Sequence, residues 1–144
     1  MRIVIDTNVL VSAVFFGGRP GEVLDLVLRR RLEAVATARI IAEYQATIEC
    51  LLERYGGAHL RLSIMPILAA MEVIPQTDNV HVCRDPDDDK FISCAVDGKC
   101  IYIVSGDKDL LAVEKYNDVE ILTVAQFLER QNATASQFRP EQQD

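Results

Sequence analysis

Several residue types that mark particular classes of protein are scarce in this 144-residue chain. Tryptophan is absent and aromatic residues make up 6% of the sequence, so a platform for stacking nucleic-acid bases would have to use tyrosine, phenylalanine or arginine. The four cysteines, which form no CxxC pair and adjoin no histidine cluster, are Cys50, Cys83, Cys94 and Cys100. This pattern indicates reduced cytosolic thiols rather than a disulfide framework or a zinc site.

Long apolar runs are also missing. No stretch approaches the roughly 20 apolar residues that a membrane-spanning helix requires. The beginning of the chain, MRIVIDTNVLVSAVFFGG, resembles a signal peptide only superficially, because Asp6 and Asn8 interrupt the apolar run. We therefore expect a cytoplasmic protein that does not associate with membranes.

Basic residues are in the minority. The chain has 22 acidic and 15 basic residues and a net charge of −7. Proteins that bind nucleic acid usually carry a basic patch, so the charge balance taken alone argues against such a function. That objection weakens if several acids converge on a metal ion, because a bound cation reverses the local field.

Short apolar segments alternate with longer amphipathic ones, which is typical of parallel βαβ units in an α/β fold. Expected strands cover residues 2–5, 33–36, 72–75, 101–104 and 119–122. Expected helices lie near 8–15, 21–31, 38–54, 58–70, 86–97 and 124–131, with a short helical turn after Gly106. The length suits one domain, placed at residues 1–131. Residues 132–144 are polar and lack periodicity, so we expect them to form a flexible tail.

The densest concentration of charge lies in RDPDDDKFISCA, residues 84–95, with acids at Asp85, Asp87, Asp88 and Asp89. The start of a helix needs one capping side chain and gains from about one further acid near its dipole. Two carboxylates about 4 Å apart repel by roughly 4 kcal/mol at an effective dielectric constant of about 20. Four adjacent acids therefore predict that another group balances their charge.

Helical geometry distinguishes these acids from one another. Pro86 suits the first helical position and Asp85 the cap before it. At 100° per residue, Asp88 lies over the apolar stripe of the helix, whereas Asp87 and Asp89 point about 100° to either side, towards solvent or supporting contacts. Asp88 is thus the acid that we expect to face inward.

Three further acids lie where ligands bind in open α/β sheets, beyond the carboxyl ends of the strands. Asp6 follows the first strand in IVIDTN, and Asp107 follows the fourth in YIVSGDKD. Glu43 lies early in the helix after strand two, whereas the later glutamates of that helix lie roughly 9 and 15 Å farther away at about 1.5 Å per residue. Asp6, Glu43, Asp88 and Asp107 can therefore converge. Such an all-oxygen site favours Mg²⁺ or Mn²⁺ and suits phosphodiester hydrolysis.

Four segments in this order, IVIDTNVLVSA, IIAEYQATI, RDPDDDKFISCA and YIVSGDKDLL, resemble the PIN-domain (PilT N-terminus) ribonucleases, especially the bacterial toxin-like group. The resemblance covers about residues 1–130. It implies a three-layer α/β/α sandwich with a five-stranded parallel sheet, Mg²⁺ or Mn²⁺ as cofactor, and endonucleolytic cleavage of an RNA substrate.

The resemblance assigns the family's carboxylates residue by residue. Asp6 and Glu43 match the first and second, Asp88 matches the third by its offset from Ala95, and Asp107 matches the fourth. Asp85 also fits the pattern of this subgroup, which makes it a further expected metal ligand. Ser105 stands where threonine is frequent in the family and keeps the hydroxyl. We expect it to orient the carboxylates, together with Thr7 and Asn8.

The resemblance also implies partners. It suggests the toxin component of a toxin–antitoxin pair, with an antitoxin encoded alongside. Together with the apolar helices near 8–15 and 58–70, it suggests a homodimer whose two acidic sites line one groove.

Alternative interpretations remain for both the residues and the function. Asp109 is a credible substitute for Asp107, and Asp85 or Asp89 could share the role of Asp88. An aspartate-nucleophile phosphatase would use Asp6, but such enzymes normally carry a second aspartate two residues later, where this chain has an asparagine. A non-catalytic module that binds RNA or protein is the other alternative. The Arg29–Arg31 triplet suits either a helix C-terminus or contact with an RNA backbone.

Overall fold

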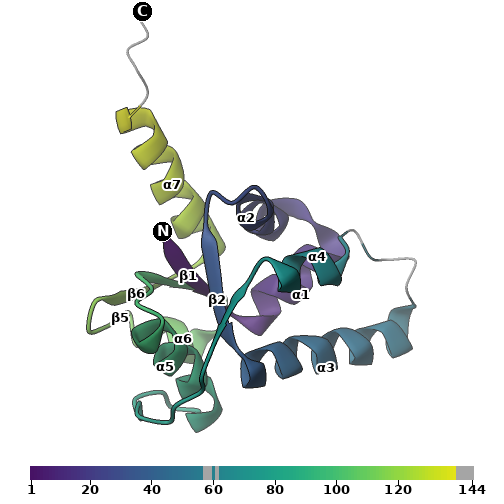
Figure 1. Cartoon of the computed structure of the whole chain (residues 1–144), viewed down its shortest axis with the longest axis horizontal. Helices are drawn as coiled ribbons and strands as arrows, with labels where there is room; N and C mark the ends of the chain where they lie inside the picture. The colour runs from purple at the N-terminus through teal and green to yellow at the C-terminus, as the bar shows by residue number, and fades with distance from the viewer. Residues whose placement is uncertain (57–59, 61, 139–144) are drawn as a thin grey trace, which may run out of the picture.

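The structure, a computed structural model, describes residues 1–56, 60 and 62–138. The fold is mixed α/β, with helices packed on a six-stranded sheet whose strand order is β3-β2-β1-β4-β6-β5 (Figure 1). The strands are β1 Arg2–Ile5, β2 Glu33–Thr37, β3 Glu72–Ile74, β4 Tyr102–Val104, β5 Lys115–Tyr116 and β6 Val119–Leu122. The α/β class and the five strands expected from the apolar runs are confirmed, with ends that differ by a residue or less.

The expectation of a purely parallel, five-stranded sheet is wrong at one edge. β5 pairs antiparallel with β6, with Lys115 opposite Glu120 and Tyr116 opposite Val119. Asn117, in the turn between them, has a φ of 52°, a left-handed conformation that asparagine adopts more readily than most residues. A strand of two residues leaves no apolar run in the sequence, which is why the pattern did not predict it.

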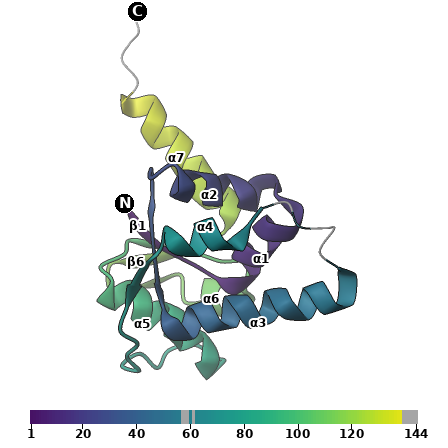
Figure 2. The ribbon, with the colours of Figure 1, turned by 45° about the vertical axis from the view of Figure 1, so that its right-hand side comes forward.

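The helices form a layer on each face of the sheet (Figures 1 and 2). Among the described residues, one face carries the four helices between β1 and β3 and a fifth after β6, and the other face carries the two helices that flank β4. The helices are α1 Thr7–Phe16, α2 Gly18–Leu28, α3 Ala38–Tyr55, α4 Ile64–Ala69, α5 Asp89–Asp97, α6 Lys108–Leu111 and α7 Val124–Phe138. No helix within the described residues is long and apolar enough to cross a membrane.

Four helices differ from their expected ranges. α5 begins at Asp89, because residues 86–88 of the range expected for it form a 3₁₀ turn. α2 ends at Leu28, before Arg30 takes a φ of 61° and reverses the chain. The helix expected at 58–70 covers Ile64–Ala69, and residues 57–59 and 61 of that range lie outside the described residues. α7 continues past residue 131 to Phe138. The division into a domain at 1–131 and a flexible tail at 132–144 stays a prediction, and residues 139–144 lie outside the described residues.

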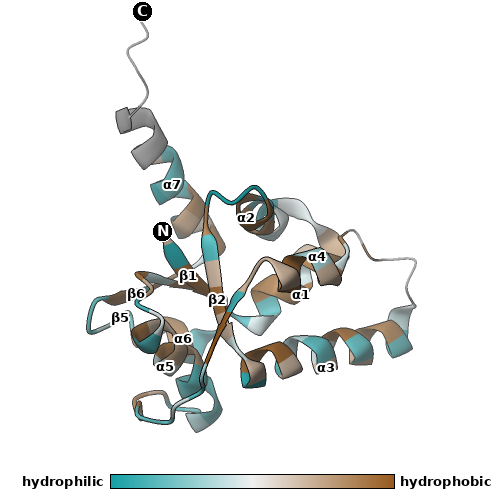
Figure 3. Cartoon of the chain, viewed as in Figure 1, coloured by the Kyte–Doolittle hydropathy of each residue, from teal (hydrophilic) through white to brown (hydrophobic). Residues whose placement is uncertain are grey.

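The core fills both sides of the sheet. Ile3, Val4 and Ile5 of the central strand are fully buried, as expected for a sheet covered on both faces. α3 shows alternating apolar and polar bands (Figure 3), because it buries one face, through Ile40 and Tyr44, and leaves the other in water. These contacts fix the strands and helices whose ends carry the acids.

The winding direction of the chain reverses between β1 and β4. The chain passes from β1 through β2 to β3 on one side, then crosses to β4 on the other side of β1. Ile5 pairs with Val104 across these two parallel strands, so Asp6 and Ser105 follow side by side. This reversal is where α/β sheets bind ligands.

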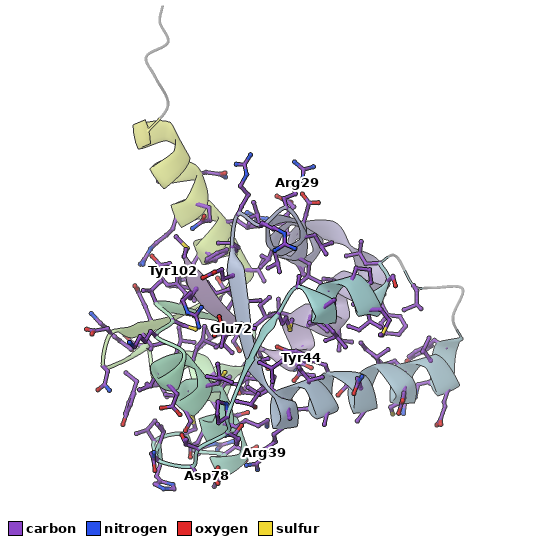
Figure 4. All side chains as sticks on the ribbon, viewed as in Figure 1. Arg29, Arg39, Tyr44, Glu72, Asp78 and Tyr102 are labelled. Carbon is purple, nitrogen blue, oxygen red and sulfur yellow. The ribbon has the colours of Figure 1, made fainter. Side chains whose placement is uncertain are left out.

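The Arg29–Arg31 triplet lies at the opposite edge of the sheet. It follows α2 and precedes β2, so it adjoins the amino ends of the strands. Arg29 pairs with Asp25 within α2 at 2.9 Å, and Figure 4 shows it far from Arg39 and Asp78. The position favours the helix C-terminus interpretation, because RNA bound at the acids would lie at the other edge.

Candidate metal centre

Asp6 lies directly beyond the carboxyl end of β1. Its side chain is buried, and its backbone N–H donates to the Val104 carbonyl at 3.0 Å. Burial raises the pKa of the Asp6 carboxyl above its usual value, and the charges of Asp107 and Glu43 raise it further, against the opposing hydrogen bond from Ser105. Asp107 and Glu43 therefore lie close enough to Asp6 for their charges to affect its pKa.

Two hydroxyl groups hold this end of the sheet in place. The fully buried Ser105 donates from Oγ to Asp6 Oδ2 at 2.6 Å and accepts from the Asp107 backbone N–H at 2.9 Å. Tyr44 Oη donates to the Ile5 carbonyl at 2.5 Å. One serine hydroxyl thus fixes Asp6 relative to Asp107, which is the orienting role expected for Ser105.

Glu43 reaches the same edge from α3. That helix starts after Thr37, whose hydroxyl accepts from the Ile40 N–H at 3.2 Å, an N-terminal cap of the usual kind. Both carboxylate oxygens of Glu43 are engaged: the Thr7 hydroxyl donates to Oε2, and Lys90 Nζ lies 2.7 Å from Oε1. Thr7 therefore orients Glu43, as expected, whereas Asn8 is exposed and makes no side-chain hydrogen bond to these acids.

The four crowded aspartates have different contacts. Asp85 caps a 3₁₀ turn at Pro86–Asp88 by accepting from the Asp87 N–H at 3.0 Å, as its position predicts. Asp87 is exposed and pairs with Lys90 at 2.8 Å. Asp89 was expected to point sideways from the helix, but it is buried and accepts from two backbone N–H groups of the preceding loop. The 3₁₀ turn ahead of α5 breaks the 100° register that the expectation assumed.

The Asp88 side chain lies beside the segment that follows β4, which carries Asp107. One carboxylate oxygen each from Asp88, Asp107 and Asp109 lies within 4.8 Å of the others. The pKa of Asp88 is raised to about 7, first by burial, then by a hydrogen bond to Asp107 and by the charges of Asp107, Asp85 and Asp6. The inward direction expected for Asp88 is observed in part: its carboxylate faces Asp107 and Asp109, but Asp88 is half-buried and Asp89 is the most deeply buried aspartate of the run.

Pairing with basic groups separates the acids into two sets. Glu43 and Asp87 share Lys90, and Asp109 pairs with Arg84 at 3.2 Å. Among the described residues, by contrast, no basic side chain forms an ion pair with the remaining set, Asp6, Asp88 and Asp107. Within the described residues, the second set therefore has no counter-charge from the protein.

The spacing of the Asp88, Asp107 and Asp109 carboxylates fits a hard divalent cation. Oxygen ligands lie about 2.1 Å from Mg²⁺, so two ligand oxygens are roughly 3 Å apart when adjacent and about 4 Å apart when opposite. Oxygens already within 4.8 Å of one another need only small rotations to reach that spacing. Carboxylates are also the donors that Mg²⁺ and Mn²⁺ prefer.

Sequence reasoning missed Lys90, which is almost completely buried. Its place directly after the aspartate run was the available signal, because a lysine on the buried side of a helix requires an acidic partner. The partner Glu43 comes from a distant helix, so spacing alone did not identify it.

Comparison with known proteins adds two matches. Residues 2–109, a range that contains all four expected carboxylates, match the model of the PIN domain. An uncharacterized protein of Methanocaldococcus jannaschii is 39% identical over 124 residues, which cover 81% of this chain and 77% of that protein. No solved structure gives a significant match to the chain.

Proposed function

Because this chain belongs to the PIN domain family, whose members are generally nucleases, we propose that it is a Mg²⁺- or Mn²⁺-dependent endoribonuclease that hydrolyses RNA phosphodiester bonds. The observation that carries this proposal is the set of unpaired carboxylates at the reversal point of the sheet. Carboxylate oxygens of Asp88 and Asp107 lie within 4.8 Å of each other, and the charge of Asp6 acts on Asp88. Within the part of the chain that the structure describes, no basic side chain forms an ion pair with these three acids. A structural role alone would not explain three acids held together against their mutual repulsion.

The acids and Ser105 have separate roles in the proposed site. Asp6, Asp88 and Asp107 would hold the divalent ion, with Glu43 beside them and Asp85 as a further ligand. When bound, such an ion activates water and neutralises charge that develops on the phosphate. Ser105 keeps two of the acids in fixed relation, so the site needs little rearrangement to bind.

Basic side chains near this edge support a path for an RNA backbone despite the net charge of −7. Arg84 is 89% exposed and Arg39 52% exposed, and both pair with acids next to the site. The exposed Lys108 begins α6 immediately after Asp107. These three cations can contact phosphates on either side of the bond that is cleaved.

The proposal is tested by offering the protein two substrates with and without a chelator. We expect internal cleavage of single-stranded RNA with Mg²⁺ or Mn²⁺, none in EDTA, and no release of nitrophenol from p-nitrophenyl phosphate. Dephosphorylation without RNA cleavage would favour the aspartate-nucleophile phosphatase. Binding of RNA without either reaction would favour a non-catalytic module.

The proposal also includes the toxin role, an antitoxin partner and a homodimer. An exposed apolar surface at the ends of α1 and α3 supports an interaction there, with Phe16 and Tyr55 exposed by 77% and 58%. A hollow of about 400 Å³ is lined by Phe15, Phe16, Leu51 and Tyr55. Contiguous apolar side chains of this size on a surface commonly mark a site of protein contact.

Light scattering tests these partners. The chain alone should have about twice its 16.1 kDa mass at micromolar concentration, because a dimer would cover the apolar surface. Addition of the protein encoded by the neighbouring reading frame should give a larger complex that no longer cleaves RNA. A monomer would remove the homodimer and leave the assignment of the acids untouched.

A further inference from the structure

Lys90 holds a buried ammonium group whose donors are all used. Its side chain is 3% exposed. Nζ lies 2.7 Å from Glu43 Oε1 and 2.8 Å from both the carbonyl oxygen and Oδ2 of Asp87. A lysine has three N–H donors, so these three acceptors account for all of them. The ring of Phe91, with its centroid 4.8 Å from Nζ, closes another side.

This ammonium fixes Glu43 in place. Lys90 takes one carboxylate oxygen, and the Thr7 hydroxyl donates to the other. Glu43 therefore already has a cation, supplied by the protein, on the side that faces α5. Asp6, Asp88 and Asp107 have no such partner among the described residues, although they lie at the same strand ends.

The acids at this edge thus define two positions for a positive charge. The Lys90 ammonium occupies the position beside Glu43, and the position beside Asp6, Asp88 and Asp107 is the other. We propose that the Lys90 ammonium takes the place of a second cation, so that the RNA-free protein binds a single divalent ion, on the side of Asp6, Asp88 and Asp107. Lys90 is then a positioning residue, which acts through Glu43. This inference rests on the proposed metal-dependent function and specifies how its site is charged.

The physical reason is repulsion between cations. A divalent ion coordinated by Glu43 Oε1 would lie within a few ångströms of an ammonium that is fixed by three hydrogen bonds and has no room to withdraw. Removal of the ammonium would release Glu43 and Asp87 together, and two carboxylates are enough to attract a second, weaker ion.

A titration of Mn²⁺ without RNA, with free Mn²⁺ counted by electron paramagnetic resonance, tests the proposal. We expect one ion per chain for the wild type and two for Lys90→Met, the second bound at least about tenfold more weakly. Lys115→Met, on the exposed edge strand β5, changes the net charge equally and should bind one ion. The double variant Lys90→Met/Glu43→Gln should return to one ion, because only one of the two released carboxylates, that of Asp87, remains.

Each outcome decides the matter. Two ions in the wild type, or one ion with wild-type affinity in a folded Lys90→Met variant, would overturn the role of Lys90 while leaving RNA cleavage intact. No ion in the wild type would remove the proposed metal-dependent function and this inference with it. If Lys90→Met fails to fold by circular dichroism, the wild-type count decides: one ion supports the proposal and two overturn it.

Discussion

The Asp88→Asn variant should cleave RNA roughly a thousandfold more slowly than the wild type, a loss of about 4 kcal/mol of transition-state stabilisation. Asparagine keeps the shape of the side chain but removes one negative charge from the acids that have no basic partner among the described residues. The measurement is single-turnover cleavage of a single-stranded RNA at saturating Mn²⁺. Asp118→Asn, an exposed aspartate in the β5–β6 turn, is a matched control and should retain full activity.

The same substitution should stabilise the metal-free protein at neutral and higher pH. The pKa of Asp88 is raised to about 7 without an ion, so the folded protein favours the protonated form more than the unfolded chain does. The stability from this group is fully present below the unfolded pKa of about 3.9 and is lost as the pH rises through 7. In EDTA, the wild type should therefore melt at a lower temperature at pH 8 than at pH 5.

Asp88→Asn should lose this part of the pH dependence and melt at the wild-type temperature or above at pH 8, because it carries no charge to repel its neighbours. A capping residue would behave differently, since loss of a cap costs about 1 kcal/mol of stability and leaves chemistry unchanged. If Asp88→Asn cleaves RNA normally and melts early, Asp88 is a cap and its assignment as a ligand is wrong.

The second large effect should distinguish Asp107 from Asp109, which belong to the same cluster of oxygens. Asp107→Asn should slow cleavage roughly a thousandfold, whereas Asp109→Asn should slow it roughly ten- to a hundredfold, the range for residues that support a metal site indirectly. Asp109 is paired with Arg84, while Asp107 forms no ion pair with a basic side chain of the described residues and is tied to Asp6 through Ser105.

Single-turnover cleavage and the dissociation constant of Mn²⁺ should be measured for both variants. Asp107 Oδ2 also accepts from the Leu110 N–H at 3.3 Å, an interaction that asparagine can keep, so both variants should fold. Equal losses of activity would mean that both acids bind the ion. A larger loss for Asp109→Asn would exchange their assignments.

The sequence predicted the parts of the fold and site that depend on local pattern. Val- and Ile-rich runs located five strands, and acids at strand ends located Asp6 and Asp107, because parallel strands bring their carboxyl ends to one edge. Pro86 and Asp85 signalled the start of the helical segment through their fixed φ and capping oxygen. Each of these inferences needed only a few adjacent residues.

Features that depend on contacts between distant segments were not predicted. Lys90 meets Glu43 across two helices, and no periodicity within either helix encodes that pair. Asp89 binds the loop at Val82 and Cys83, which required the path of that loop to be known. The crowded aspartates therefore have separate roles that their spacing alone did not reveal.

An anomalous-difference map from crystals grown with Mn²⁺ would test the central claim most directly. The account predicts one peak per chain, about 2.1–2.2 Å from carboxylate oxygens of Asp88 and Asp107, in the octahedral oxygen environment usual for such ions. It also predicts no peak beside Glu43 Oε1, where Lys90 lies. The absence of a peak at Asp88 and Asp107 under saturating Mn²⁺, or a peak at other acids, would contradict the account.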